Sequence, residues 1–167
     1  MTKIYLIGMP GSGKSTLGRP LAAELGVPFV DQDKEIENRE GKAVKDIFAQ
    51  NGEDYFRQVE AEVLREWAAS AKSFVMATGG GAPCFYEGID VIRQSGLSIF
   101  IDTSVTELLK RVATNKDRPL LHAADLKEKE DRLQELHKKR LPVYQQAHIV
   151  LQHPTVKDLL EAVKLRK

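Results

Sequence analysis

The sequence contains 167 residues, about the length of one domain, and a chain of this size can bury a substantial hydrophobic core. Hydrophobic residues make up 42% and charged residues 29%, and 25 basic residues against 24 acidic ones leave a net charge of +1. This balance excludes disorder as the main state, and it gives no overall basic field for nonspecific binding to nucleic acid or membranes.

Cysteine, histidine and hydropathy exclude further classes. The single cysteine, Cys84, rules out an internal disulfide and a cysteine zinc cage, and it fits a reducing compartment. No apolar run approaches the roughly 18 residues of a membrane span or the about 7–15-residue core of a signal peptide. We therefore expect a cytoplasmic, monomeric enzyme or binding domain without nucleic-acid or membrane partners. The histidines lack metal-ligand spacing and are interpreted as structural or surface groups: His122, His137, His148 and His153.

Short apolar segments alternate with amphipathic ones along the chain. The order predicts a strand at 3–7, a helix at 14–25, a strand at 28–30, helical structure from 33 to about 69 with breaks near Gly41 and Asn51–Gly52, a strand at 73–77, a helix at 87–94, a strand at 97–101, a helix at 104–113, a strand at 148–151 and a helix at 155–165. The polar stretch 115–125 is expected to be a mobile loop. The alternation predicts one α/β domain, residues 1–167, with a five-stranded parallel sheet between two layers of helices.

Chemically distinctive residues follow the ends of several expected strands. They are the glycine-rich segment 8–13, the carboxylates Asp31 and Asp33, and the glycine run, defined as Gly79, Gly80 and Gly81. Ligands of such sheets bind at the carboxyl ends of the strands. These residues are therefore expected to gather on one edge of the sheet.

The segment Gly8-Met9-Pro10-Gly11-Ser12-Gly13-Lys14-Ser15 matches G-x-x-x-x-G-K-[ST] in full. Glycines let the backbone N–H groups turn toward phosphate oxygens, and the following helix adds the positive end of its dipole. Lys14 can reach the outer phosphates, and the Ser15 hydroxyl can bind Mg²⁺. The motif lies between a strand and a helix, so it predicts a nucleoside triphosphate site. A GTPase is excluded because 115–118 reads Asn-Lys-Asp-Arg, with arginine where the base-reading aspartate belongs.

Two carboxylates, Asp31 and Asp33, directly follow the second expected strand. One can hold Mg²⁺ through water, and the other can orient an attacking hydroxyl or accept its proton. A helix N-cap explains the same spacing equally well. Asp102, at the end of the fourth strand, is a rival magnesium ligand, and spacing alone does not decide between the alternatives.

Three arginines and the glycine run are further candidates. Arg57 lies three residues before Glu60, and in isolation this spacing favours a surface ion pair. Arg118, in the polar loop, could reach a transferring phosphoryl group, and Arg140 closes a basic helix end. The glycine run is better explained by close approach of a ligand than by a flexible turn.

Taken together, the sequence resembles the shikimate kinase family, over nearly the whole chain. The phosphate-binding loop at 8–15, or P-loop, is by itself shared by many families. The full set of matching segments, in this order and with this spacing, is specific. The matching segments are 8–16, 29–33 with Ile36-Glu37, 52–57 with Glu60, 77–81, Arg111, Asn115, 118–121 and 140–144. The stretch after Leu121 departs from the family pattern because it lacks a glycine, which concerns the dynamics of a lid more than the chemistry.

The resemblance implies a fold, two cofactors or substrates and a site. It implies a P-loop kinase with a substrate-binding helical region at about 32–60, a lid at about 115–125, ATP and Mg²⁺. The catalytic residues it implies are Lys14, Asp33 and Arg118, and the metal ligands are Ser15 and, through water, Asp31. The implied nucleotide contacts are Gly11, Ser12, Gly13, Lys14, Ser15, Thr16, Arg111, Arg118 and Pro154. The implied shikimate contacts are Asp33, Phe48, Phe56, Arg57, Gly79, Gly80, Gly81 and Arg140.

The implied activity is transfer of the γ-phosphoryl group of ATP to the 3-hydroxyl of shikimate, a step of chorismate and aromatic amino-acid biosynthesis. A phosphate acceptor that is itself an acid needs arginines to bind its carboxylate, and its hydroxyls need a carboxylate to bind them. Two alternatives remain: another small-molecule kinase of the same fold, such as a gluconate kinase, and a nucleotide-binding regulatory module without turnover. Intact Lys14, Ser15, Asp31 and Asp33 argue against the second.

Overall fold

The computed structural model describes residues 1–113 and 123–166. Within them the strands are β1 (Lys3–Ile7), β2 (Phe29–Asp31), β3 (Phe74–Ala77), β4 (Leu97–Asp102) and β5 (Ile149–Gln152). The helices are α1 (Lys14–Leu25), α2 (Gln32–Glu40), α3 (Val44–Ala69), the short 3₁₀ helix η1 (Ala82–Cys84), α4 (Gly88–Ser95), α5 (Val105–Ala113), α6 (Ala123–Tyr144) and α7 (Val156–Leu165). The predicted alternation of strands and helices is confirmed.

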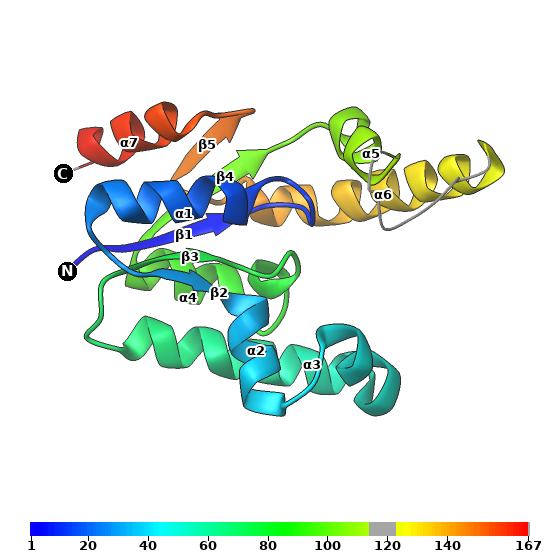
Figure 1. Ribbon diagram of the computed structural model, residues 1–167, viewed down its shortest axis with the longest axis horizontal. Coiled ribbons are helices and arrows are strands. Elements are labelled where there is room, and N and C mark those ends of the chain that lie inside the picture. The colour runs from blue at the N-terminus through cyan, green and yellow to red at the C-terminus, as the bar shows by residue number, and fades with distance from the viewer. Residues whose placement is uncertain (114–122, 167) are drawn as a thin grey trace.

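The strands form one parallel sheet in the order β2-β3-β1-β4-β5. Because all the strands run in the same direction, their carboxyl ends share one edge. In Figure 1 both chain termini lie at the opposite edge, and α2, α3, α5 and α6 extend past the carboxyl ends. The candidate residues that follow these strands are thereby collected on one side of the molecule.

Alternating residues of the strands face two separate cores. On one face Ile4, Leu6 and Ile99 pack against α1 and α7. On the other face Tyr5 and Phe100 pack against α3, α4 and α6. Burial on both faces explains why the central strands read as nearly continuous apolar runs, and it makes the sheet a rigid base for the site.

The second and third helices form a separate lobe beside the sheet. Ile36 of α2 and Ile47, Phe56 and Val59 of α3 are buried against one another in a small core of their own. The helix α3 is interrupted at Gly52, one of the two predicted breaks, and the helix α2 ends at the other, Gly41. This lobe carries Asp33 at its start and Arg57 near its middle.

Some boundaries differ from the sequence-based prediction. The second strand spans 29–31 instead of 28–30, because Asp31 pairs with Ala77 of β3. Residues 123–125, predicted as the end of the loop, form the first turn of α6, whereas residues 114–122 lie outside the described part of the chain. Across the two described ranges, the helices are too short or too polar to cross a membrane.

Candidate active site

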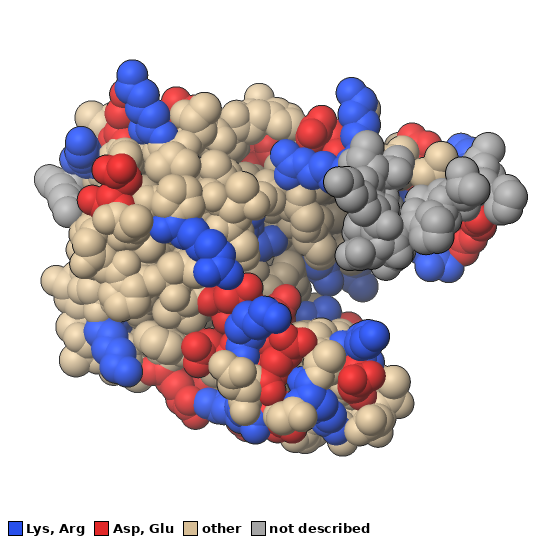
Figure 2. All heavy atoms as spheres, viewed as in Figure 1, with Lys and Arg blue, Asp and Glu red and all other residues tan. Residues whose placement is uncertain are grey.

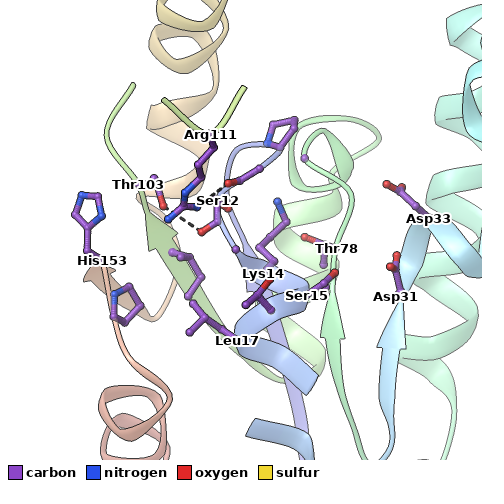
Figure 3. Close-up of a pocket in the computed structure, with 18 residues that line it drawn as sticks. Ser12, Lys14, Ser15, Leu17, Asp31, Asp33, Thr78, Thr103, Arg111 and His153 are labelled. Carbon is purple, nitrogen blue, oxygen red and sulfur yellow. Dashed lines mark hydrogen bonds between the residues drawn. The ribbon is translucent and has the colours of Figure 1, made fainter. Parts of the chain in front are cut away.

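The P-loop and the carboxyl ends of the strands enclose a cavity of about 720 Å³. The predicted nucleotide-binding residues Gly11, Ser12, Gly13, Lys14, Ser15, Thr16, Arg111 and Pro154 all line it, together with Asp31, Asp33 and Gly80. Figure 3 shows Asp31 and Asp33 on one side of the cavity, Arg111 and His153 on the other, and Lys14 between them. The structure therefore brings the phosphate-binding motif and the two carboxylates to one cavity.

The P-loop is shaped by close backbone packing. Gly8 adopts a φ of 150°, and a Cβ there would stand 2.8 Å from the carbonyl oxygen of Ile101. Thr103 also donates a hydrogen bond of 3.1 Å to the carbonyl of Ser12. The buried Ser12 hydroxyl has no hydrogen-bond partner in the described residues. The loop is thus fixed to the end of β4 and retains an unused polar group beside the cavity.

Lys14 is a buried cation at the centre of the cavity. Its Nζ donates to the carbonyls of Gly8 at 2.7 Å and Met9 at 2.9 Å. The pKa of Lys14 is lowered to about 8, chiefly by burial and in part by Arg140, whereas the carboxylates Asp33 and Asp31 oppose the shift. A phosphate placed beside the ammonium would favour the charged form. The arrangement suits a lysine that exchanges loop carbonyls for phosphate oxygens.

Asp31 and the Ser15 hydroxyl supply oxygen ligands of the kind Mg²⁺ prefers, and Mg²⁺ normally takes only one or two protein ligands with phosphates and water. No cluster of three or more His, Cys, Asp or Glu side chains suited to a metal occurs in residues 1–113 and 123–166. The cavity therefore fits a metal that arrives with a phosphate ligand. The rival carboxylate Asp102 does not line the cavity. Asp31 also caps α2, accepting from Lys34 N at 3.3 Å, so the N-cap alternative and the cavity position hold together.

Asp33 lies in the first turn of α2 and borders the open cavity. Desolvation by the surrounding walls raises the pKa of its carboxyl, and the negative charge of Asp31 raises it further; Lys14 and Arg57 act in the opposite sense. A hydroxyl brought between Asp33 and the P-loop would face both a proton acceptor and the phosphate chain. The carboxylate is therefore placed for an acceptor hydroxyl.

Arg57 forms a buried ion pair, so the interpretation of a surface pair is wrong. Its guanidinium Nη1 donates to Glu60 Oε1 at 2.9 Å, and the two side chains are 9% and 2% exposed. Burial raises the pKa of Glu60, and Arg57 opposes the shift. Three rings surround the guanidinium, at 4.3 Å for Phe85, 5.3 Å for Phe56 and 5.9 Å for Phe48. Helix folding brings Arg57 and Glu60 together, and packing against the glycine run and the three rings buries them.

The glycine run lies against charged groups from three other segments. A Cβ at Gly79 would stand 2.6 Å from Glu60 Oε2 and 3.2 Å from Asp33 Oδ1, and one at Gly81 would overlap the guanidinium of Arg57. A Cβ at Gly80 would stand 3.0 Å from Arg140 Nη1 and 2.8 Å from Pro10 of the P-loop. Only glycine allows this approach, so the run is more than a flexible turn. It borders the cavity at Gly80 and lies against two arginines and two carboxylates.

Sequence reasoning missed several residues of the site. His153, interpreted as structural or surface, lines the nucleotide cavity, and Phe85 contacts Arg57 more closely than either predicted phenylalanine. Gln32 and Tyr144 hydrogen-bond to the glycine run from opposite sides. One signal was available: Tyr144 lies four residues after Arg140 and therefore shares its helix face.

The remaining predicted residues fall at the edge of the cavity or outside the description. Arg111 of α5 donates to the carbonyl of Gly11 at 2.7 Å and pairs with Glu107 at 3.4 Å, which holds its side chain against the P-loop. Arg118 lies outside the described residues. Figure 2 shows the surface hollowed between the α2–α3 lobe and the α5–α6 arm, with basic and acidic side chains at the opening.

Comparison with known proteins gives this geometry a family. The family model described as shikimate kinase matches residues 10–163. The chain belongs to the shikimate kinase family. A shikimate kinase from Persephonella marina is 42% identical over 149 residues, which cover 89% of this chain and 87% of the relative.

Solved shikimate kinases share the fold over almost the full length. The crystal structure of the enzyme from Bacteroides thetaiotaomicron superposes with a TM-score of 0.89 and 34% identity, covering 98% of both chains. A shikimate kinase from Acinetobacter baumannii in complex with shikimate gives a TM-score of 0.87 and 35% identity, covering 100% of this chain and 95% of that one. A gluconokinase from Sinorhizobium meliloti, at a TM-score of 0.55 and 16% identity, shares the fold alone.

Proposed function

We propose that this member of the shikimate kinase family transfers the γ-phosphoryl group of ATP to the 3-hydroxyl of shikimate, giving shikimate 3-phosphate and ADP in the cytoplasm. One observation carries the proposal: the glycine run, which borders the P-loop cavity at Gly80, lies against Asp33, Arg57 and Arg140. An anionic polyol acid needs cations for its carboxylate and an acceptor for its hydroxyl. A nucleotide acceptor would instead need a base pocket and phosphate-binding arginines.

In this proposal the P-loop positions the triphosphate. Backbone N–H groups of 11–16 and the N-terminus of α1 face the phosphates, and Lys14 moves from the carbonyls of Gly8 and Met9 to the transferred phosphate. Arg111 and Pro154, which both line the cavity, flank the two faces of the adenine. Because phosphoryl transfer depends mainly on positioning and charge stabilisation, these residues supply most of what the nucleotide half must do.

The proposed metal ligands are Ser15 directly and Asp31 through water. Mg²⁺ held by these residues would supply positive charge that offsets the negative charge on the phosphates during transfer. Asp31 is already oriented by its position at the N-cap of α2, which places its carboxylate at the cavity wall.

The acceptor half holds shikimate by its two kinds of polar group. Arg57 and Arg140 bind the carboxylate, and Phe48 and Phe56 shape the wall behind it. Asp33 binds the hydroxyls and either accepts the proton of the 3-hydroxyl or aligns that hydroxyl with the γ-phosphate. The backbone of the glycine run lies along the substrate, with Gly80 nearest to it.

Transfer also requires that water be kept from the γ-phosphate, because water is itself an acceptor. We assign Arg118, which lies outside the described residues, to close over the bound nucleotide and stabilise the transferring group. This assignment rests on the family pattern of the sequence at Arg118-Pro119.

An acceptor screen tests the proposal. ADP release from ATP and Mg²⁺ is measured with shikimate, with gluconate, with nucleoside monophosphates and without an acceptor. We expect release that depends on shikimate alone. Release with another acceptor would retain the kinase but replace its substrate. ATP binding without transfer to any acceptor would favour a regulatory nucleotide-binding module.

A further inference from the structure

Gln32, which lies between Asp31 and Asp33 in the sequence, has a fully buried side-chain amide. It is 0% exposed, and both ends of its side chain bond to backbone. Its Nε2 donates to the carbonyl of Glu60 at 3.0 Å, and its Oε1 accepts from the N–H of Gly79 at 2.9 Å. Gln32 therefore ties the first glycine of the run to the turn of α3 that carries the partner of Arg57.

Tyr144 holds the same run from the other side. Its ring is 0% exposed and packs on Phe100 of β4, with ring centroids 5.1 Å apart. Its hydroxyl donates to the carbonyl of Gly80 at 2.6 Å. Burial raises the pKa of Tyr144 to about 12, so the hydroxyl stays protonated and remains a donor at physiological pH. One turn earlier on the same helix is Arg140.

The glycine run needs external support because it has no side chains of its own. Three successive glycines have the largest conformational freedom to lose on ordering. Yet the run must fill a narrow space between Pro10 and Arg140 on one side and Glu60 and Arg57 on the other. Hydrogen bonds from buried side chains are a direct way to fix such a backbone.

We propose that Gln32 and Tyr144 are positioning residues that hold the glycine run and, through it, set the geometry of the acceptor subsite. Gln32 connects the run to the segment bearing Arg57 and Glu60, and Tyr144 connects it to the helix bearing Arg140. The two arginines proposed to bind the acceptor are thus both positioned relative to the backbone of the glycine run. The inference rests on the proposed acceptor site, and it adds two residues that touch neither substrate in that proposal.

The expected kinetic consequence is selective. Loss of preorganisation weakens the ligand whose contacts are no longer held in place. The P-loop keeps its own supports, including the Thr103–Ser12 hydrogen bond and the close packing of Gly8 on Ile101. Removing Tyr144 or Gln32 contacts should therefore raise the KM for shikimate and leave the KM for ATP nearly unchanged.

Tyr144→Phe is the first variant, because it deletes one hydroxyl and keeps the ring. The chain offers a matched control in Tyr5→Phe: Tyr5 is also 0% exposed, and its hydroxyl bonds to Ser95 at 2.8 Å, away from the glycine run. We expect Tyr144→Phe to raise the KM for shikimate about three- to tenfold, the equivalent of one net hydrogen bond. Tyr5→Phe should leave both KM values unchanged, even where both variants lower Tm by similar amounts.

Gln32→Met is the second variant, because methionine keeps the unbranched shape and removes both hydrogen bonds. We expect a larger selective rise in the KM for shikimate, about tenfold or more, since Gly79 N–H and the Glu60 carbonyl both lose a partner. The double variant Gln32→Met/Tyr144→Phe should raise it by less than the product of the single effects, because both act on one three-residue backbone.

The outcomes separate this inference from the proposed function. A wild-type enzyme active with shikimate, together with selective KM changes in both site variants and none in Tyr5→Phe, supports the inference. Wild-type activity with unchanged shikimate KM in both site variants overturns it and leaves the function intact, as do equal rises for ATP and shikimate or an equal effect of Tyr5→Phe. A wild-type enzyme that is inactive with shikimate would contradict both the proposed function and this inference.

Discussion

The two halves of the active site are built in different ways. The proposed nucleotide half is mostly one continuous segment, 8–16, which lines the cavity with loop backbone and the single lysine Lys14. The acceptor half is assembled from the start of α2, the middle of α3, the glycine run and the end of α6, and it includes the buried Arg57–Glu60 pair. A site formed by one continuous segment can be recognised from its sequence motif. A site formed by residues far apart in the sequence depends on how the helices and strands pack.

The difference also predicts how the halves fail. A phosphate site formed by backbone N–H groups tolerates many side-chain substitutions, but it depends on its glycines and on Lys14. A set of buried charges depends on every partner, because one removed side chain leaves another charge unpaired. Substitutions in the acceptor half should therefore weaken the binding of shikimate more than that of ATP. Substitutions in the nucleotide half should weaken the binding of ATP more than that of shikimate.

The largest effect is expected at Asp33. Asp33→Asn should reduce kcat by about 10²- to 10⁴-fold, the range for loss of a positioned proton acceptor, while ATP still binds. Asp102→Asn is the matched control, because Asp102 is a carboxylate at the carboxyl end of β4 that does not line the cavity. Steady-state kinetics and nucleotide titrations measure both. Near-normal turnover of Asp33→Asn would remove Asp33 from the reaction.

Lys14→Met should reduce transfer by about 10²- to 10³-fold, since a charge aimed at the transferred phosphate is lost. Shikimate binding, followed by calorimetry, should persist. Lys3→Met provides the control, because Lys3 also bonds two carbonyls, those of Ala68 and Ser70, but lies at the start of β1. If Lys3→Met lost transfer to the same extent, the effect of Lys14→Met would reflect folding and not phosphate binding.

Replacement of either acceptor arginine should weaken shikimate far more than ATP. We expect the KM for shikimate to rise about 10- to 100-fold in Arg140→Ala and in Arg57→Lys, because each loses charge-assisted hydrogen bonds to a carboxylate. Lysine at 57 keeps a cation beside Glu60, which alanine would leave buried and unpaired.

Arg39→Ala is the control for these arginines. Arg39 pairs with Glu62 and Glu66 on the exposed side of α3, away from the cavity. It should leave both KM values unchanged. Equal losses for shikimate and ATP in Arg57→Lys and Arg140→Ala would mean that the two arginines do not bind the acid.

The smallest predicted effect is a shift in the pH profile. Asp33 must be ionised to accept the proton of the 3-hydroxyl, so the rate should fall as pH drops through its raised pKa, above the pH at which an ordinary aspartate titrates. Glu37 contributes to raising that pKa. Glu37→Gln should therefore move the acidic limb of kcat/KM to lower pH.

Glu35→Gln, on the same helix, is the control for the pH prediction, because Glu35 is not among the charges that shift Asp33. It should leave the acidic limb in place. A shift of the limb to higher pH in Glu37→Gln would contradict the assigned sign, and an equal shift in both variants would point to the net charge of α2 instead.

The sequence was sufficient for the sheet, the P-loop and the two carboxylates, because each has a local signal: apolar runs, a fixed motif and a strand end. It misjudged the isolated Arg57–Glu60 pair, because helical spacing does not say which face is buried. Gln32 was passed over because nothing in its neighbours shows that both ends of its amide meet distant backbone. Arg118 stays a prediction, since it lies outside the described residues.

The central claim is that the acceptor half directs the 3-hydroxyl of shikimate to the γ-phosphate. The most direct measurement is the structure of the product formed from ATP and shikimate, determined by phosphorus and proton NMR. The account predicts one new phosphate ester, coupled to the proton on carbon 3, together with stoichiometric ADP. Phosphate on another hydroxyl, or inorganic phosphate alone, would contradict it.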